Sequence, residues 1–148
     1  MLFSVAPSAA AAASDEEMII QVQTNFMKAY STKDLELMYS LYYHSSDTST
    51  FNPGDQPLLC KGWKEDLEER WRNTFASETN NVTVTFHNPQ ATKIKDDVAV
   101  LTGYEVATYT NPTTKEQTVN HNRVTRVVKK VNGEWLIVHD HVTTFTVK

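Results

Sequence analysis

The C-terminal half of the chain contains three consecutive β-rich segments that are much longer than ordinary strands. They span residues 98–110, 117–131 and 134–147, and are separated by the turn signals Asn111-Pro112 and Asn132-Gly133. Each holds about 13 residues, whereas most strands hold five or six. Strands of this length must coil or bend to remain compact, and such short turns join antiparallel neighbours. These segments therefore predict a strongly curved antiparallel sheet.

Shorter strands precede this meander. Residues 82–86 alternate apolar and polar side chains, Asn88-Pro89 is expected to form a turn, and a short strand containing Ile94 ends at Asp96-Asp97. In the next segment, Gly103 stands in mid-strand, where we expect a bulge. The sheet thus begins near residue 81.

The residues before the sheet show helical periodicity. Ser14 and Glu17 have the spacing of a capping box, which predicts that a helix begins there. A polar stretch at 44–50 and a loop at 52–57, rich in proline, separate the second helix from the third. The apolar faces of the three expected helices are Ile19, Val22, Phe26 and Tyr30; Leu35, Met38, Tyr39 and Tyr42; and Trp63, Leu67, Trp71 and Phe75.

Helices followed by a curved antiparallel meander define an α+β domain. The 148 residues suit a single domain, expected at 15–148 after a disordered, alanine-rich leader at 1–14. We expect a cytoplasmic protein. The alternative is a secreted or periplasmic protein in which residues 1–14 are the remnant of a signal.

Composition excludes several classes of function. A net charge of -4 provides no basic surface for nucleic acid, and no run of 18 apolar residues is present to span a membrane. The single cysteine, Cys60, cannot form an internal disulfide. Nucleotide-binding glycine loops and serine-hydrolase motifs are absent, and no cofactor is expected.

The tail NRVTRVVKKVNGEWLIVHDHVT closely resembles the final hairpin of SnoaL-like domains. It also resembles the association, or hub, domain of calcium/calmodulin-dependent protein kinase II, which belongs to the same nuclear transport factor 2-like superfamily. EEMIIQVQTNFMKAYSTKDLELMY and KGWKEDLEERW are similar to the helices of that hub. The resemblance implies a cone-shaped sheet wrapped around N-terminal helices, with one pocket between them.

In the hub domain a similar pocket accepts small acidic molecules. Trp71 and Arg126 match the pocket tryptophan and arginine of that pattern. Trp63, Glu105 and Val142 depart from it, because the hub has His, Arg and Arg at these positions. The ligand-binding residues implied here form a pocket of mixed charge, namely Trp71, Glu105, Arg126 and Asp140.

Enzymes of this superfamily use a pocket carboxylate as general base on small carbonyl compounds. Asp140 lies where SnoaL-type cyclases carry an acid, and Tyr30 could donate a hydrogen bond to an enolate. The resemblance thus allows an isomerase, dehydratase or cyclase. The alternative is that Asp140 only pairs with Arg126 or faces solvent, and that the Tyr30 hydroxyl lies at the surface.

Histidines offer a further alternative. His139 and His141 alternate on one strand face and could hold a metal, with His121 or His87 as a third ligand. No acidic partner for the histidines is evident at a suitable spacing. We therefore interpret His139 and His141 as packing or interface residues and expect no metal.

The register of the final hairpin decides which side chains share a face. A two-residue loop at 132–133 would pair Arg126 with His139, whereas a bulged loop at 131–133 would pair Arg126 with Val138. We expect the bulged form, which places one largely apolar face beneath the helices: Val124, Arg126, Val128, Leu136, Val138 and Val142. The opposite face would then bury Trp135, Ile137, His139 and His141 against another subunit.

These observations predict a self-associating, non-catalytic module with a small-molecule pocket. We expect a homo-oligomer, either a dimer or a ring of dimers. Because the resemblance includes a kinase hub and no kinase domain is present, a kinase or another signalling protein is a further candidate partner. The alternative function is an isomerase, dehydratase or cyclase with Asp140 as base.

Overall fold

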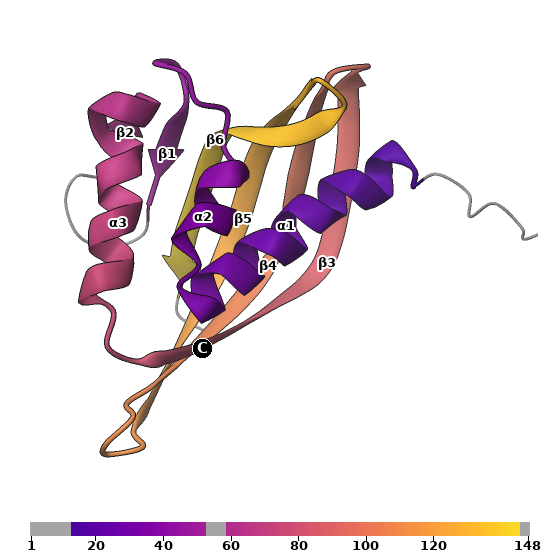
Figure 1. The fold of residues 1–148 in the computed structure, drawn as a ribbon. Coiled ribbons are helices and arrows are strands. Elements are labelled where there is room, and N and C mark those ends of the chain that lie inside the picture. Colours follow the sequence, from indigo (N-terminus) through magenta and orange to yellow (C-terminus); the bar gives the residue numbers. More distant parts are fainter. Residues whose placement is uncertain (1–12, 53–58, 146–148) are drawn as a thin grey trace, which may run out of the picture.

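The computed structural model describes residues 13–52 and 59–145, which form helices packed on one side of a curved sheet (Figure 1). The first helix is followed by a short second one, and the third begins with a π-helical turn. Residues 1–12 of the predicted leader at 1–14 lie outside the described residues. The same holds for residues 53–57 of the predicted loop at 52–57. The helical elements are α1 (Asp15–Thr32), α2 (Leu35–Ser40), η1 (Trp63–Leu67) and α3 (Glu68–Ser77).

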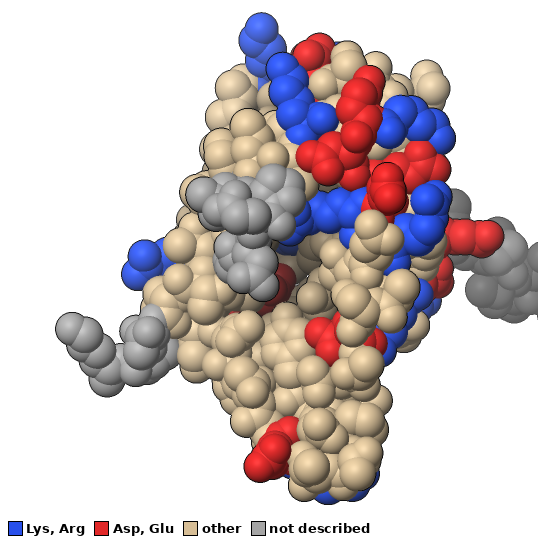
Figure 2. All heavy atoms as spheres, turned by 90° about the vertical axis from the view of Figure 1, so that its left-hand side faces the viewer, with Lys and Arg blue, Asp and Glu red and all other residues tan. Residues whose placement is uncertain are grey.

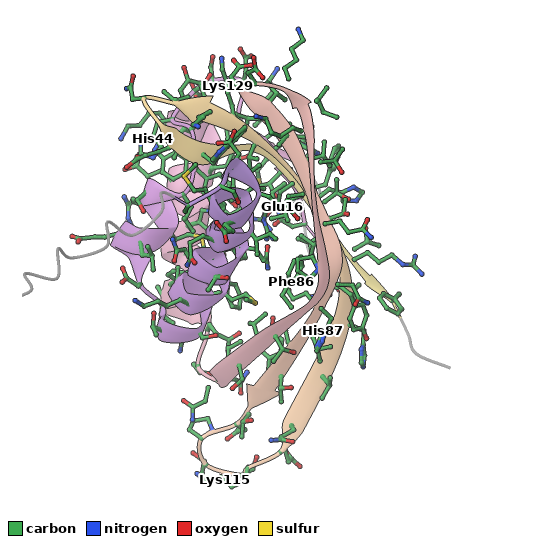
Figure 3. All side chains as sticks on the ribbon, turned by 90° about the vertical axis from the view of Figure 1, so that its right-hand side faces the viewer. Glu16, His44, Phe86, His87, Lys115 and Lys129 are labelled. Atoms are coloured by element: carbon green, nitrogen blue, oxygen red, sulfur yellow. The ribbon has the colours of Figure 1, made fainter. Side chains whose placement is uncertain are left out.

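The sheet has six strands in the order β2-β1-β6-β5-β4-β3. All neighbours are antiparallel except β1 and β6, which are parallel. The α+β prediction is confirmed. The tip of the β4–β5 hairpin, marked by Lys115 in Figure 3, extends beyond the helices. The strands are β1 (Ser49–Phe51), β2 (Leu59–Lys61), β3 (Asn81–Lys95), β4 (Val98–Thr110), β5 (Gln117–Val131) and β6 (Glu134–Phe145).

Helix α1 begins as its sequence predicts. Ser14 caps the helix, and Glu17 completes the capping box by accepting from the Ser14 backbone at 2.8 Å. The next residue, Asp15, then ties the helix to the sheet through Lys93 and Lys130, each at 2.7 Å. The start of α1 is therefore fixed both locally and by the sheet.

Two features of the long strands differ from prediction. Asn88 does not end a strand: it adopts a left-handed conformation (φ 51°) at a register shift within a continuous β3. Gly103 is not a bulge, because it pairs regularly with Val124. A side chain at Gly103 would overlap the ring of Phe86, so the glycine makes room for this ring beneath the helices (Figure 3).

The final hairpin combines features of both predicted registers. Val131 pairs with Glu134 across a two-residue loop, in which Asn132 and Gly133 both have positive φ. A register shift farther along leaves Val138 without a partner on β5, so that Arg126 pairs with Asp140. The expected bulge thus exists, but it lies at Val138 and not in the loop.

This placement corrects the predicted faces of β6. Arg126, Asp140 and Val142 share the inner face as expected, but Leu136 and Val138 do not join them. Trp135 and Ile137 are instead 4% and 0% exposed in the core. Their predicted burial against another subunit is therefore wrong. The bulge at Val138 shifts the in-and-out alternation of side chains by one residue. Trp135 and Ile137, which precede it, therefore face the opposite side of the sheet from the one predicted.

Strands β1 and β2 were not predicted: β1 begins in the polar stretch at 44–50, and β2 follows the loop expected at 52–57. Thr50 is fully buried and lies opposite Asp140 on the adjacent β6. Cys60 pairs with Thr50 and is also buried. These short strands complete the sheet, and Asn52, which follows β1, lines the site described below.

Candidate functional site

A pocket of about 460 Å³ opens between the inner face of the sheet and helices α1 and α3. Figure 2 shows a hollow near the middle of one face of the molecule, bordered mainly by uncharged atoms. The wall contributed by the helices is aromatic, and the wall contributed by the strands is polar. The lining residues are Phe26, Tyr30, Asn52, Arg70, Trp71, Thr74, Val84, Glu105, Tyr109, Asn120, Asn122, Asp140, Val142 and Thr144.

An ion pair lies at the inner end of this pocket. Nε of Arg126 is 3.2 Å from Oδ1 of Asp140, and the two side chains are 0% and 1% exposed. Their contact is not aligned as a hydrogen bond, although Tyr42 donates to Oδ2 of Asp140 at 3.3 Å. Burial and the neighbouring carboxylate raise the pKa of Tyr42 well above its usual value, so its hydroxyl remains a donor. Asp140 therefore has two defined partners, Arg126 and Tyr42.

Gln23 connects this ion pair to the second pocket carboxylate. Nη1 of Arg126 donates to Oε1 of Gln23, and Nε2 of Gln23 donates to Oε2 of Glu105 at 3.4 Å. Because a guanidinium can only donate, it fixes the orientation of the Gln23 amide. The amide must then present its NH₂ group to Glu105.

A cross-strand row holds the other side of Glu105. Asn122 donates to Oε1 of Glu105 at 3.0 Å, and Thr144 donates to Oδ1 of Asn122 at 2.8 Å. The three residues come from β4, β5 and β6, where the register places them side by side. Both oxygens of Glu105 consequently accept hydrogen bonds from neutral amides.

The helical wall is formed by a cluster of aromatic rings. Trp71 makes edge contacts with Phe26 and Tyr30, with ring centroids 5.7 and 6.3 Å apart. The Tyr30 hydroxyl lies 3.4 Å from that of Tyr109. Burial raises the pKa of both tyrosines, with Glu105 adding to the shift. Arg126 packs against the far side of this cluster, 3.9 Å from the centre of the Phe26 ring.

The structure brings most of the predicted site residues together. Trp71, Glu105 and Asp140 line the pocket, whereas Arg126 lies directly behind Asp140. Tyr30 also lines the pocket, but the tyrosine that contacts Asp140 is Tyr42.

Sequence reasoning missed Gln23, Tyr42 and Asn122 as site residues. A signal was available for Gln23, because it lies four residues after Ile19 on the buried face of α1. Polar side chains at such positions require a buried partner. No comparable signal marked Asn122.

The outer face of the sheet carries a separate aromatic group. Tyr104 contacts His121 and Phe145, and Arg123 lies 4.6 Å above the Phe145 ring. Val119 on the same face is 47% exposed, and His87 points away from the helices (Figure 3). The described helices all lie on the opposite side of the sheet, so they leave this aromatic face uncovered.

The predicted interface histidines lie on this outer face at its β1 edge. His139 contacts Ser49 at 2.9 Å, and the ring of Phe51 lies against both His139 and His141. Within residues 13–52 and 59–145, no group of three or more His, Cys, Asp or Glu side chains is arranged to hold a metal. In the same part of the chain, no helix is long and apolar enough to cross a membrane.

Helices packed over a curved sheet with one interior pocket define the nuclear transport factor 2-like class of proteins. The model of the SnoaL-like domain matches residues 19–147, and the chain belongs to this family. No curated protein matches the chain.

Solved structures share the fold at low sequence identity. A candidate dehydratase of the NTF2-like family from Streptomyces avermitilis superposes with a TM-score of 0.77 at 16% identity, covering 88% of this chain and 96% of that one. A candidate calcium/calmodulin-dependent protein kinase II association domain from Xanthomonas campestris gives 0.74 at 16%, covering 100% of both chains. A candidate aromatic ring hydroxylase from Novosphingobium aromaticivorans gives 0.73 at 15%, covering 90% of both chains. The fold is thus common to proteins with different described roles.

Proposed function

We propose that this protein is a non-catalytic, self-associating module that binds a small molecule between its helices and its sheet. The observation that carries the proposal is the pocket, which joins an aromatic wall to a few fixed polar groups. Ligand sites of this kind are concave and mainly apolar, and a small number of polar groups orient the ligand. A volume of about 460 Å³ suits a compound of one or two rings.

The ion pair favours binding over catalysis. A general base must reach a proton of the substrate, whereas the Asp140 carboxylate faces the buried guanidinium of Arg126. Asp140 is also restrained by the Tyr42 hydroxyl and is only 1% exposed. Its role in this proposal is to shape and polarise the pocket.

Self-association through the outer face of the sheet is the second part of the proposal. The group formed by Tyr104, His121 and Phe145 combines apolar area with hydrogen-bonding capacity, as protein interfaces often do. Its position on the side opposite the pocket leaves the ligand site accessible in an oligomer. A kinase or another signalling protein is a candidate for a further partner of such an assembly.

A fragment screen by thermal shift tests the binding function. Compounds of one or two rings should raise the melting temperature, and Val142→Phe should abolish the shift because Val142 lines the pocket. Ile94→Phe is the matched control, because Ile94 is 61% exposed on β3. Hits that bind equally to Val142→Phe, or a complete absence of hits, would contradict the proposal.

The native mass, measured by light scattering, tests self-association. Val119→Glu and Thr125→Glu each place a charge on the outer face, and either should lower the mass. Glu16→Lys, on the exposed side of α1, should not change it (Figure 3). A monomeric wild-type protein would rule out this part of the proposal.

An isomerase, dehydratase or cyclase is the second candidate function. The observation in its favour is the meeting of a carboxylate and a tyrosine hydroxyl, Asp140 and Tyr42, at the pocket. Turnover of a cyclic ketone that is lost in Asp140→Asn and in Tyr42→Phe, without a change in native mass, would support the enzyme. Lack of turnover across a panel of small carbonyl compounds would support the binding module.

A further inference from the structure

The two pocket carboxylates differ in how their charge is balanced. Asp140 is paired with Arg126, whereas the partners of the two Glu105 oxygens within the described part of the chain are the amides of Gln23 and Asn122. Glu105 is 7% exposed, and no ion pair to it is found among the described residues. A buried negative charge without a counter-ion is costly. A positively charged ligand group would offset this cost.

The surroundings of Glu105 suit an organic cation. The rings of Phe26, Tyr30, Trp71 and Tyr109 line the same pocket, and aromatic faces attract ammonium groups. Glu105, Tyr30 and Tyr109 all line this pocket, and the Glu105 carboxylate contributes to the raised pKa of both tyrosines. An amine in this part of the pocket would meet a carboxylate and aromatic rings together.

The opposite side of the pocket offers donors. Nδ2 of Asn52 is buried and has no hydrogen-bond partner within the described residues. Arg70 lines the same wall, with its Nη1 2.9 Å from Sγ of Cys60 on β2. In the strand order β2-β1-β6-β5-β4, these groups are separated from Glu105 by the width of several strands. Strands lie about 4.8 Å apart, so β1 and β4 are about 14 Å apart. The side chains of Asn52 and Glu105 both line the pocket and shorten the gap that a ligand has to fill.

We propose that the pocket selects a small organic cation, with its amine against Glu105 and an acceptor oxygen toward Asn52. The inference rests on the proposed binding function and adds the chemical class of the ligand. Asp140 does not compete for the amine, because its charge is balanced by Arg126. Attraction of the amine therefore depends on Glu105, whereas Arg70 lies on the opposite wall of the pocket.

Three probes that share one ring and differ in the terminal group test this inference. They are tyramine, which is cationic, tyrosol, which is neutral, and 4-hydroxyphenylacetate, which is anionic. In isothermal titration at pH 7 with the wild-type protein, tyramine should bind about tenfold more tightly than tyrosol, as one desolvated cation–carboxylate contact predicts. 4-Hydroxyphenylacetate should bind most weakly. Equal binding of tyramine and tyrosol, or a preference for the acid, would overturn the inference and leave the binding function intact.

A pair of variants assigns the selectivity to one residue. Glu105→Gln should remove the preference for tyramine over tyrosol. Glu78→Gln removes a charge that also acts on Tyr30 but does not line the pocket, so it should retain the preference. Retention of the preference in a folded Glu105→Gln would refute the assignment. If circular dichroism shows that Glu105→Gln does not fold, the three probes on the wild-type protein still test the inference. Failure of all three probes to bind the wild-type protein refutes the inference. The fragment screen tests the binding function separately.

Discussion

The buried Arg126–Asp140 pair makes a quantitative prediction about stability. Replacing Asp140 by Asn keeps the shape of the side chain and an acceptor for Tyr42, but leaves the guanidinium of Arg126 buried without a counter-ion. The pair is 0% and 1% exposed, so solvent cannot compensate. Removal of one partner of such a pair costs about 3–5 kcal/mol. Arg126→Met should cost a similar amount, because it leaves the carboxylate unpaired.

The double variant distinguishes an ion pair from two independent contributions. Asp140→Asn combined with Arg126→Met removes both charges, and the free energy of unfolding should return to within about 2 kcal/mol of the wild-type value. Nη2 of Arg126 has no hydrogen-bond partner among the described residues, so the further loss is that of the hydrogen bond to Gln23 and the contact with Phe26. Urea unfolding at one fixed protein concentration measures all four proteins. Additive losses in the double variant would refute this account of the pair.

Three further predictions concern other regions. Lys130 and Lys93 lower the pKa of Asp15 below its usual 3.8. The contribution of Asp15 to stability is therefore full above pH 3.8 and is lost as the pH falls below this value. In urea unfolding, Asp15→Asn should reduce stability at pH 7 but not in acid. Gly103→Ala should cost about 1–3 kcal/mol in the same assay, because the new methyl group meets Phe86, and Phe86→Leu should restore part of the loss. Burial raises the pKa of Tyr30 and Tyr42 above 10.0, so stability falls as the pH rises past this value, and ultraviolet titration should show them ionising only on unfolding.

Local signals in the sequence were sufficient to predict the elements that form by local rules. The capping box at Ser14 and the turn at Asn132-Gly133 specify the start of α1 and the final hairpin through a few adjacent residues. The bulge at Val138 could not be placed in this way. Residues 135–138 are Trp, Leu, Ile and Val, and no polar residue among them marks which alternate set faces the core. Only packing under the helices selects Trp135 and Ile137.

The candidate site was predictable in its residue types but not in its connections. Trp71, Glu105 and Asp140 were placed at the pocket by a resemblance that also implied Arg126. The arrangement of these charges depends on Gln23, which lies 103 residues from Arg126 and 82 from Glu105 in the sequence. Contacts of this range leave no periodic signal in a single sequence.

The position of Gln23 links the fold to the chemistry of the site. Helix α1 crosses the sheet at the point where β4 and β5 carry Glu105 and Arg126, and Gln23 lies between the two charges. A guanidinium there would pair with Glu105, and a carboxylate would compete with Asp140 for Arg126. A neutral amide does neither: it accepts from Arg126 and donates to Glu105, so each keeps its own role. Asp140 thereby stays paired with Arg126, and Glu105 has no charged partner among the residues that the structure describes.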